Sequence, residues 1–163
     1  MDGIRDAVYP GSFDPITFGH VNIVKRAIER FDKLHVVVMD NPNKNYLFSL
    51  DERLAMVKND LKEVKNVVVD TYNGLLVNYL KEHKIYNLIR GLRAVSDYEY
   101  ELQMAHANKS LLPELEIFFL MADTKFSYIS SSMIKEIAMY DGDISKWVSP
   151  YVESKLKERL LKK

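Results

Sequence analysis

One segment near the start of the chain reads Tyr9-Pro10-Gly11-Ser12-Phe13-Asp14-Pro15-Ile16-Thr17-Phe18-Gly19-His20. It follows a short apolar run and precedes a helical pattern that begins near Gly19, which indicates a strand, a tight loop and a helix start. The first N–H groups of a helix lack partners and carry partial positive charge, so such a start can bind phosphate. Gly19 leaves room for a ligand, and His20 in the first turn can donate to a phosphate oxygen. Alternatively, His20 only caps or packs against the helix.

The composition is that of an ordinary soluble globular domain, with 163 residues, 47% of them hydrophobic and 28% charged. We expect a single domain over residues 1–163. The 23 basic residues balance 23 acidic ones, so no overall charge draws the chain to nucleic acid or to an anionic membrane. Any site for an anion therefore has to be local.

Several classes of protein are disfavoured by what the sequence lacks. It contains no cysteine, which excludes disulfides, thiolate nucleophiles and Cys-ligated metal sites. It has neither a G-x-G-x-x-G fingerprint nor a P-loop, and its other histidines show no metal-ligand spacing, so we expect no metal-binding residues. Residues 1–6 hold no signal-peptide core and no apolar run reaches membrane-spanning length. We expect a cytoplasmic protein that binds neither membrane nor nucleic acid.

Short β-branched apolar runs alternate along the chain with longer helical patterns. Near-continuous hydrophobicity is typical of strands buried on both faces of a parallel sheet. The expected strands are Ala7–Tyr9, Leu34–Met39, Val67–Thr71, Asn87–Ile89 and Ile117–Met121. Helices are expected near residues 19–31, 50–63, 74–83, 95–112, 131–140 and 150–161, the last within a C-terminal helical segment at about 145–161. The pattern predicts an α/β fold: a doubly wound, Rossmann-like, five-stranded parallel sheet with helices on both faces.

Polar segments follow each of the expected strands. They lie at residues 10–20, 41–44, 74–76, 90–93 and 126–132. In a doubly wound fold, ligands bind beyond the carboxyl ends of the strands, near the point where the strand order reverses. We therefore expect one site, built from five loops at one edge of the sheet.

The fourth of these segments, Arg90-Gly91-Leu92-Arg93, places two guanidinium groups around a glycine. The planar fork of arginine donates two parallel hydrogen bonds to a phosphate, which favours a binding role over a pair of solvated surface arginines. On the helix that follows, Glu101 can accept hydrogen bonds from ribose hydroxyls or orient an arginine, or it can belong to a solvent-facing row of ion pairs.

Two further segments offer phosphate contacts together with simpler interpretations. Lys44, in a polar loop, can swing onto a phosphate as a mobile charge, although most loop lysines are only solvated. Ser130, Ser131 and Ser132 at a helix start supply hydroxyls and free N–H groups. N-capping explains these serines equally well, and both roles can hold together.

Taken together, these segments resemble one family of enzymes. Thr17-Phe18-Gly19-His20 is similar to the T/H-x-G-H signature of the nucleotidyltransferase superfamily, and Ile129-Ser130-Ser131-Ser132 is similar to its second nucleotide-binding motif. Residues 9–20 and 90–101 resemble the bacterial phosphopantetheine adenylyltransferases in particular. The resemblance extends over essentially the whole chain and keeps the order and spacing of the motifs.

This resemblance implies a reaction of coenzyme A biosynthesis. AMP would pass from ATP to 4′-phosphopantetheine by direct in-line attack, giving dephospho-CoA and pyrophosphate. Mg²⁺ would accompany ATP, held by phosphates and water. The resemblance also implies a homohexamer and feedback binding of coenzyme A.

The roles of individual residues are likewise what the resemblance implies. His20, Ser12, Lys44 and Arg93 would be catalytic, with His20 on the α-phosphate. The ATP site would comprise Ser12, Phe13, His20, Gly91, Leu92, Arg93, Glu101, Phe126, Ser127, Tyr128, Ile129, Ser130, Ser131 and Ser132. The 4′-phosphopantetheine site would comprise Ser12, Lys44, Leu75, Leu76, Arg90, Asn108 and Glu136.

Two other functions stay open at this point. A related adenylyltransferase would act on a different phosphate, such as nicotinamide mononucleotide, and the apolar Leu75-Leu76 pair favours a long flexible substrate over it. A regulatory module would bind a nucleotide or coenzyme A without turnover, but it would not need so many groups around the α-phosphate. A tRNA-linked role would require a basic face that the balanced charge does not indicate.

Overall fold

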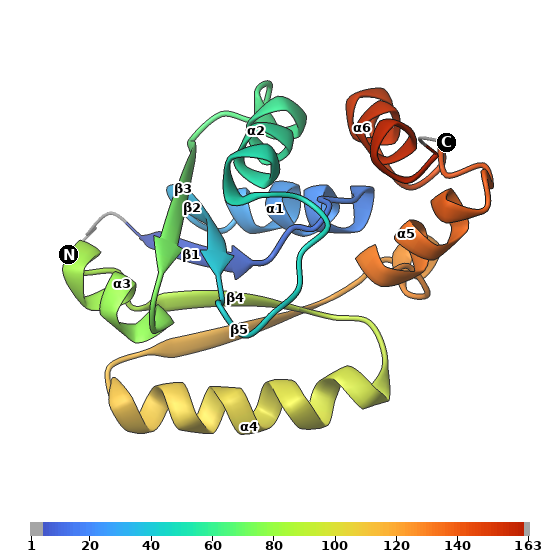
Figure 1. Ribbon diagram of the computed structural model, residues 1–163. Coiled ribbons are helices and arrows are strands. Elements are labelled where there is room, and N and C mark those ends of the chain that lie inside the picture. Colours follow the sequence, from blue (N-terminus) through green and yellow to red (C-terminus); the bar gives the residue numbers. More distant parts are fainter. Residues whose placement is uncertain (1–4, 162–163) are drawn as a thin grey trace.

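Five parallel strands form one sheet, in the order β3-β2-β1-β4-β5, in the computed structural model, which describes residues 5–161 and, of residues 95 and 96, only the backbone (Figure 1). The strands are β1 (Asp6–Gly11), β2 (Lys33–Asp40), β3 (Val67–Asn73), β4 (Asn87–Leu92) and β5 (Glu116–Met121). The order reverses at β1, which pairs with β2 on one side and with β4 on the other. The doubly wound parallel sheet predicted from the sequence is confirmed.

The helices follow the strands in alternation, as expected. They are α1 (Phe18–Ile28), α2 (Leu50–Leu61), α3 (Leu76–His83), α4 (Val95–Leu111), α5 (Ser131–Met139) and α6 (Pro150–Leu160). A short 3₁₀ turn, η1 (Thr124–Phe126), follows β5 and is not among the expected elements. The predicted elements thus exist, and their ends shift by a few residues.

Helices cover both faces of the sheet (Figure 1). On each face a hydrophobic cluster lies between the sheet and its helices. Successive strand residues point to opposite faces, so Val36 and Val38 join the cluster under α1, α2, α5 and α6. Their neighbour Val37 joins the cluster that contains Val77 of α3 and Leu112 after α4. Burial on both faces explains why the strands read as continuous apolar runs.

The sequence also encodes where two helices begin. α1 and α2 each start with a capping box, in which Thr17 pairs with His20 and Ser49 pairs with Glu52. These caps orient the first turns of both helices. In α1 the capping partner is His20, which the sequence indicates as a hydrogen-bond donor to a phosphate oxygen.

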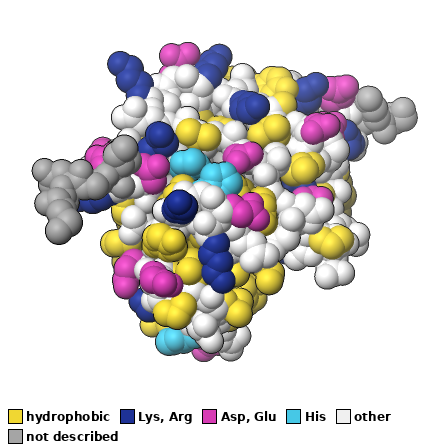
Figure 2. Space-filling view, turned by 90° about the vertical axis from the view of Figure 1, so that its left-hand side faces the viewer, with side chains coloured by type: hydrophobic (Ala, Val, Ile, Leu, Met, Phe, Trp, Pro, Cys, Tyr) yellow, Lys and Arg dark blue, Asp and Glu magenta, His cyan; other side chains and the backbone are white. Residues whose placement is uncertain are grey.

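The surface carries mixed charge on the side where α3 lies. Figure 2 shows acidic, basic and hydrophobic side chains intermingled over the described part of this face. Within residues 5–161, no helix is both long enough and apolar enough to cross a membrane. The predicted single domain also includes residues 1–4 and 162–163, which lie outside the described residues. The predicted C-terminal helical segment contains α6.

Candidate active site

A cavity of about 390 Å³ lies beyond the carboxyl ends of β1 and β4, where the strand order reverses. Such a crevice is where doubly wound sheets hold their ligands. The lining residues come from five separate segments: Tyr9, Pro10, Gly11, Ser12, Thr17, Gly19, His20, Ile23, Lys44, Arg90, Gly91, Arg93, Glu101, Ala122, Phe126, Ile129, Ser130, Ser131 and Ser132. The tertiary structure therefore assembles most of the residues singled out in the sequence.

His20 is held in one orientation by the helix start that it caps. The backbone N–H of Thr17 donates to Nδ1 of His20 at 3.0 Å, and the Thr17 hydroxyl lies 3.1 Å from the same nitrogen. Since Nδ1 accepts a hydrogen bond from the backbone, the proton of the neutral ring is on Nε2. His20 lines the cavity, so the histidine offers it an N–H donor.

The surroundings keep the His20 ring neutral. Burial, together with the positive charges of Arg93 and Arg90, lowers the pKa of His20 from 6.5 to about 4. The charged form is disfavoured both by lost hydration and by like charge nearby. At neutral pH the ring is therefore a hydrogen-bond donor without a net charge.

Arg90 is fixed by a two-point ion pair with Glu101. Its Nε donates to Glu101 Oε2 at 2.7 Å and its Nη2 to Oε1 at 2.5 Å, while Nη1 donates to the carbonyl of Pro10 at 3.2 Å. Burial lowers the pKa of Arg90, but the hydrogen bonds and charge of Glu101 outweigh it and raise that pKa above its ordinary value. Glu101 thus orients an arginine, which is one of the three interpretations that the sequence left open.

Arg93 links the end of β4 to the segment after β5. Its Nη1 donates to the carbonyl of Ile129 at 2.7 Å, and its Nε donates to Asp97 at 3.1 Å. The side chain remains partly exposed, so it can also contact an anion in the cavity that it lines. Arg93 therefore joins the two loops that would hold a nucleotide.

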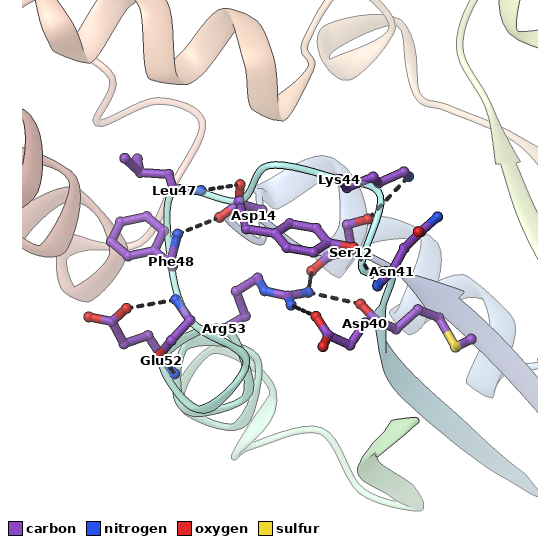
Figure 3. A network of polar contacts seen from close by, with 12 residues as sticks. Ser12, Asp14, Asp40, Asn41, Lys44, Leu47, Phe48, Glu52 and Arg53 are labelled. Carbon is purple, nitrogen blue, oxygen red and sulfur yellow. Dashed lines mark hydrogen bonds and ion pairs between the residues drawn. The ribbon is translucent and has the colours of Figure 1, made fainter. Parts of the chain in front are cut away.

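Lys44 comes from the β2–α2 loop and reaches across to the β1–α1 loop. Its Nζ lies 3.5 Å from the Ser12 hydroxyl (Figure 3). This is a long hydrogen bond between exposed groups, so it exerts little constraint. Lys44 and Ser12 share the wall of the main cavity, where both can meet the same phosphate.

The start of α5 closes another side of the cavity. The Ser130 hydroxyl accepts from the N–H of Met133 at 3.1 Å and so caps the helix, while Ser131 donates to the carbonyl of Pro15 at 2.8 Å. The cavity therefore faces the N-termini of both α1 and α5, which carry partial positive charge. The serines cap the helix and line the cavity at once.

A second cavity of about 260 Å³ shares Arg90 and Glu101 with the first. Its remaining walls are largely apolar and are formed by Met39, Asn41, Gly74, Leu75, Leu76, Leu88, Tyr100, Met104, Ala105, Asn108 and Ile117. Glu101, Ala105 and Asn108 line it from one face of α4, as their spacing predicts. An elongated ligand with an anionic end can thus extend past Arg90 into an apolar groove.

Phe13 lines a third hollow, of about 330 Å³, that adjoins the main cavity at Ser12, His20 and Lys44. Four predicted residues do not line any of the three: Leu92, Ser127, Tyr128 and Glu136. Ser127 donates instead to the carbonyl of Thr124. Tyr128 is exposed and meets the edge of Trp147, and Glu136 is exposed on α5. Their assigned contacts stay predictions.

Three residues that line or support the site were not predicted from the sequence: Tyr9, Asp14 and Arg53. Tyr9 lines the cavity, and burial raises the pKa of its phenol to about 12 despite Arg90 and Arg93 nearby, so it stays protonated. Asp14 lies within the segment of residues 9–20 but has no predicted role, and Arg53 directly follows a capping box that explains the helix start and not the arginine. A buried charged residue looks like any surface charge until the packing around it is known.

Comparison with known proteins places this site in an enzyme class. Residues 8–137 match the model of the cytidylyltransferase-like family. In solved structures, a putative nicotinate-nucleotide adenylyltransferase from Vibrio parahaemolyticus superposes with a TM-score of 0.68 at 16% identity, covering 93% of this chain and 90% of that one. At this identity the likeness shows the fold. The chain belongs to the cytidylyltransferase-like nucleotidyltransferases.

Relatives with much higher identity narrow the assignment. A phosphopantetheine adenylyltransferase from Petrotoga mobilis is 79% identical over 161 residues, covering 99% of both chains. Another, from Thermotoga neapolitana, is 60% identical over 154 residues, covering 94% of this chain and 96% of its own. Within its class, the chain is a member of the phosphopantetheine adenylyltransferase family, as the motifs predicted.

Proposed function

We propose that the protein transfers AMP from ATP to 4′-phosphopantetheine, releasing dephospho-CoA and pyrophosphate. The observation that carries the proposal is the main cavity, where Arg90, Arg93, Lys44 and two helix N-termini surround a neutral histidine donor. Among the described residues of this wall, Glu101 is the one carboxylate, and Arg90 neutralises it. The walls thus favour anions and offer no strong nucleophile.

The proposed reaction is a single in-line displacement. An oxygen of the substrate phosphate attacks the α-phosphorus of ATP, and the bond to the oxygen that bridges the α- and β-phosphates breaks. Pyrophosphate leaves with that electron pair. Since negative charge builds on the α-phosphoryl oxygens, the enzyme acts by positioning and electrostatic stabilisation.

His20 is the residue proposed to meet that charge. Its Nε2–H would donate to an α-phosphoryl oxygen, while the Thr17 N–H holds the other ring nitrogen. Lys44 and Ser12, 3.5 Å apart, would hold the attacking phosphate between them. A donor that is already oriented costs little reorganisation when the charge develops.

Each of the two cavities would hold one of the two substrates. The main cavity, with Arg93, Phe126 and residues 129–132, would hold ATP. The apolar groove beyond Arg90, with Leu75, Leu76 and Asn108, would hold the pantetheine arm. Mg²⁺ would enter as MgATP, held by phosphates and water, because Glu101, the one carboxylate among the described residues that line the main cavity, is engaged by Arg90.

Assembly and regulation are proposed as well. Tyr100, Met104 and Leu111 share one side of α4 by their spacing and are 41–60% exposed, and α4 is the longest helix of the described chain. Such an exposed apolar face supports a homo-oligomer, which we propose to be a hexamer of a cytoplasmic enzyme. Light scattering measures its mass. Coenzyme A, which contains the phosphopantetheine unit, would compete for the same two cavities.

The test is pyrophosphate release from ATP and Mg²⁺ with three acceptors: 4′-phosphopantetheine, unphosphorylated pantetheine and nicotinamide mononucleotide. We expect release with 4′-phosphopantetheine alone, because only it combines an attacking phosphate with an arm that fits the groove. Release with the mononucleotide instead would keep the chemistry and replace the substrate. No release with any acceptor, while ATP still binds, would favour the regulatory module.

A further inference from the structure

Arg53 of α2 is a charged side chain that no solvent reaches, with 0% of its surface exposed. It does not line any of the three cavities. Burying a guanidinium is costly unless it is paired and hydrogen-bonded, so its partners must account for its presence. Those partners lie at the end of β2 and in the two loops that carry Ser12 and Lys44.

The guanidinium joins the ends of two neighbouring strands. Nη1 donates to the carbonyl of Ser12 at 2.8 Å and to the carbonyl of Met39 at 2.9 Å, and Nη2 donates to Asp40 Oδ1 at 2.8 Å (Figure 3). Ser12 belongs to the loop after β1, and Asp40 is the last residue of β2. Arg53 thereby fixes the start of the β2–α2 loop relative to Ser12.

The same side chain also contacts that loop beyond Lys44. The Tyr46 ring lies over the guanidinium, 3.8 Å from its central carbon, and the Tyr46 hydroxyl accepts from the N–H of Asn41 at 3.0 Å. Lys44 stands between these points, where its own N–H donates to the carbonyl of Asn41 at 3.0 Å. Lys44 therefore lies between Asp40 and Tyr46, and both of these residues contact Arg53.

We propose that Arg53 is a positioning residue of the AMP transfer, which sets the Lys44 ammonium against Ser12 without touching substrate. The inference rests on the proposed function. The long contact between Lys44 and Ser12 cannot fix the ammonium by itself. The location of Lys44 must then come from the backbone of its loop. Arg53 ties the start of that backbone to Ser12, and Asp14 accepts from the N–H groups of Leu47 and Phe48 beyond Lys44.

The role requires an arginine rather than any cation. The guanidinium is a rigid planar fork that reaches three acceptors from two nitrogens and stacks on an aromatic ring, whereas lysine has one nitrogen at the end of a flexible stem. Arg53→Lys keeps the charge but loses the fork and the stacking. A displacement of about 1 Å at reacting groups can cost about 100-fold in rate, so we expect kcat/KM to fall by about 10- to 100-fold.

The test is a double-mutant cycle of Arg53→Lys with Lys44→Ala, read as kcat/KM for pyrophosphate release and as the calorimetric Kd for 4′-phosphopantetheine. If Arg53 acts through Lys44, its substitution costs about 10- to 100-fold with Lys44 present and less than about threefold without it. An equal loss in both backgrounds, or no loss in either, would overturn the inference. Activity in the unmodified chain, measured alongside, tests the proposed function separately.

A matched control and a milder variant keep the cycle informative. Arg159→Lys alters an arginine of α6 that contacts the same loop by donating to the carbonyl of Leu47 and that pairs with Glu52 of α2. Its effect should be below about twofold and additive with Lys44→Ala. If Arg53→Lys does not fold, Tyr46→Leu removes the stacked ring and the contact to Asn41 instead. Tyr46 is half-buried, and the loss of kcat/KM that Tyr46→Leu causes should likewise depend on the presence of Lys44. An equal loss with Lys44 and with Lys44→Ala would overturn the inference in the same way.

Discussion

Replacing His20 with alanine removes a donor that the fold holds in a fixed orientation. In the intact protein Nδ1 accepts from the Thr17 N–H, which leaves Nε2–H for the α-phosphoryl oxygens. Loss of one such donor typically costs about 2–4 kcal/mol of transition-state stabilisation. We therefore expect kcat/KM for pyrophosphate release to fall by about 30- to 1000-fold, while ATP binding, measured by calorimetry, changes little.

The pH dependence separates a neutral donor from a charged acid. With the pKa of His20 lowered to about 4, the ring gains its proton only as the pH falls through that value, so about 1% is charged at pH 6. Substrate phosphates titrate in the same range, and the ratio of intact to His20→Ala activity cancels their contribution. We expect this ratio to stay constant between about pH 5.5 and pH 8.

Two results would refute the reasoning. If kcat/KM of His20→Ala stayed within twofold of that of the intact protein, His20 would have no part in the mechanism. A ratio that changes around the ordinary histidine pKa of about 6.5 would show that the charge of the ring matters. Ser149→Ala is the control for the lost helix cap, because Ser149 caps α6 by accepting from Val152 at 3.3 Å. It should lower thermal stability but leave kcat/KM unchanged.

Three further predictions follow from the cavities and the core. Arg90→Ala should raise KM for 4′-phosphopantetheine at least about 10-fold while KM for ATP stays within about twofold; equal damage to both in steady-state assays would contradict its role. Leu75→Ala, at a position 62% exposed, should raise the same KM about 3- to 10-fold without changing the melting temperature, and an unchanged KM would exclude Leu75 from the groove. Ile134→Ala, fully buried in α5, should cost about 2–5 kcal/mol in urea unfolding, whereas the exposed Val68→Ala should cost less than about 1 kcal/mol; similar costs would contradict the assigned core.

The fold was accessible from the sequence because its signals are local. Five apolar runs of strand length alternate with helical patterns, and this order leaves little choice besides a doubly wound sheet. The capping box at Ser49 and Glu52 marks the start of α2 at the observed residue. The turn η1 was missed, because three residues in a polar loop produce no periodicity.

The site was accessible in part. Ser12, His20, Lys44, Arg90 and Arg93 come together in one cavity, because parallel strands deliver their carboxyl ends to one edge of the sheet. Glu101 shows what the sequence left open. Its spacing is compatible with a ribose contact, an arginine partner or a solvent-facing ion pair, and only the distances to Arg90 decide among them.

The linear chain alone determines the order of the elements, the edge of the sheet at which the polar loops gather and the residue types at that edge, since all three depend on neighbours in sequence. Only the folded protein reveals that His20 is neutral and oriented, or that Arg53 is buried and joins the ends of two strands. These properties come from residues far apart in the chain: Arg93 and Arg90 lower the pKa of His20, and Ser12 and Asp40 accept from Arg53. Burial and electrostatics act through space, and no local pattern records them.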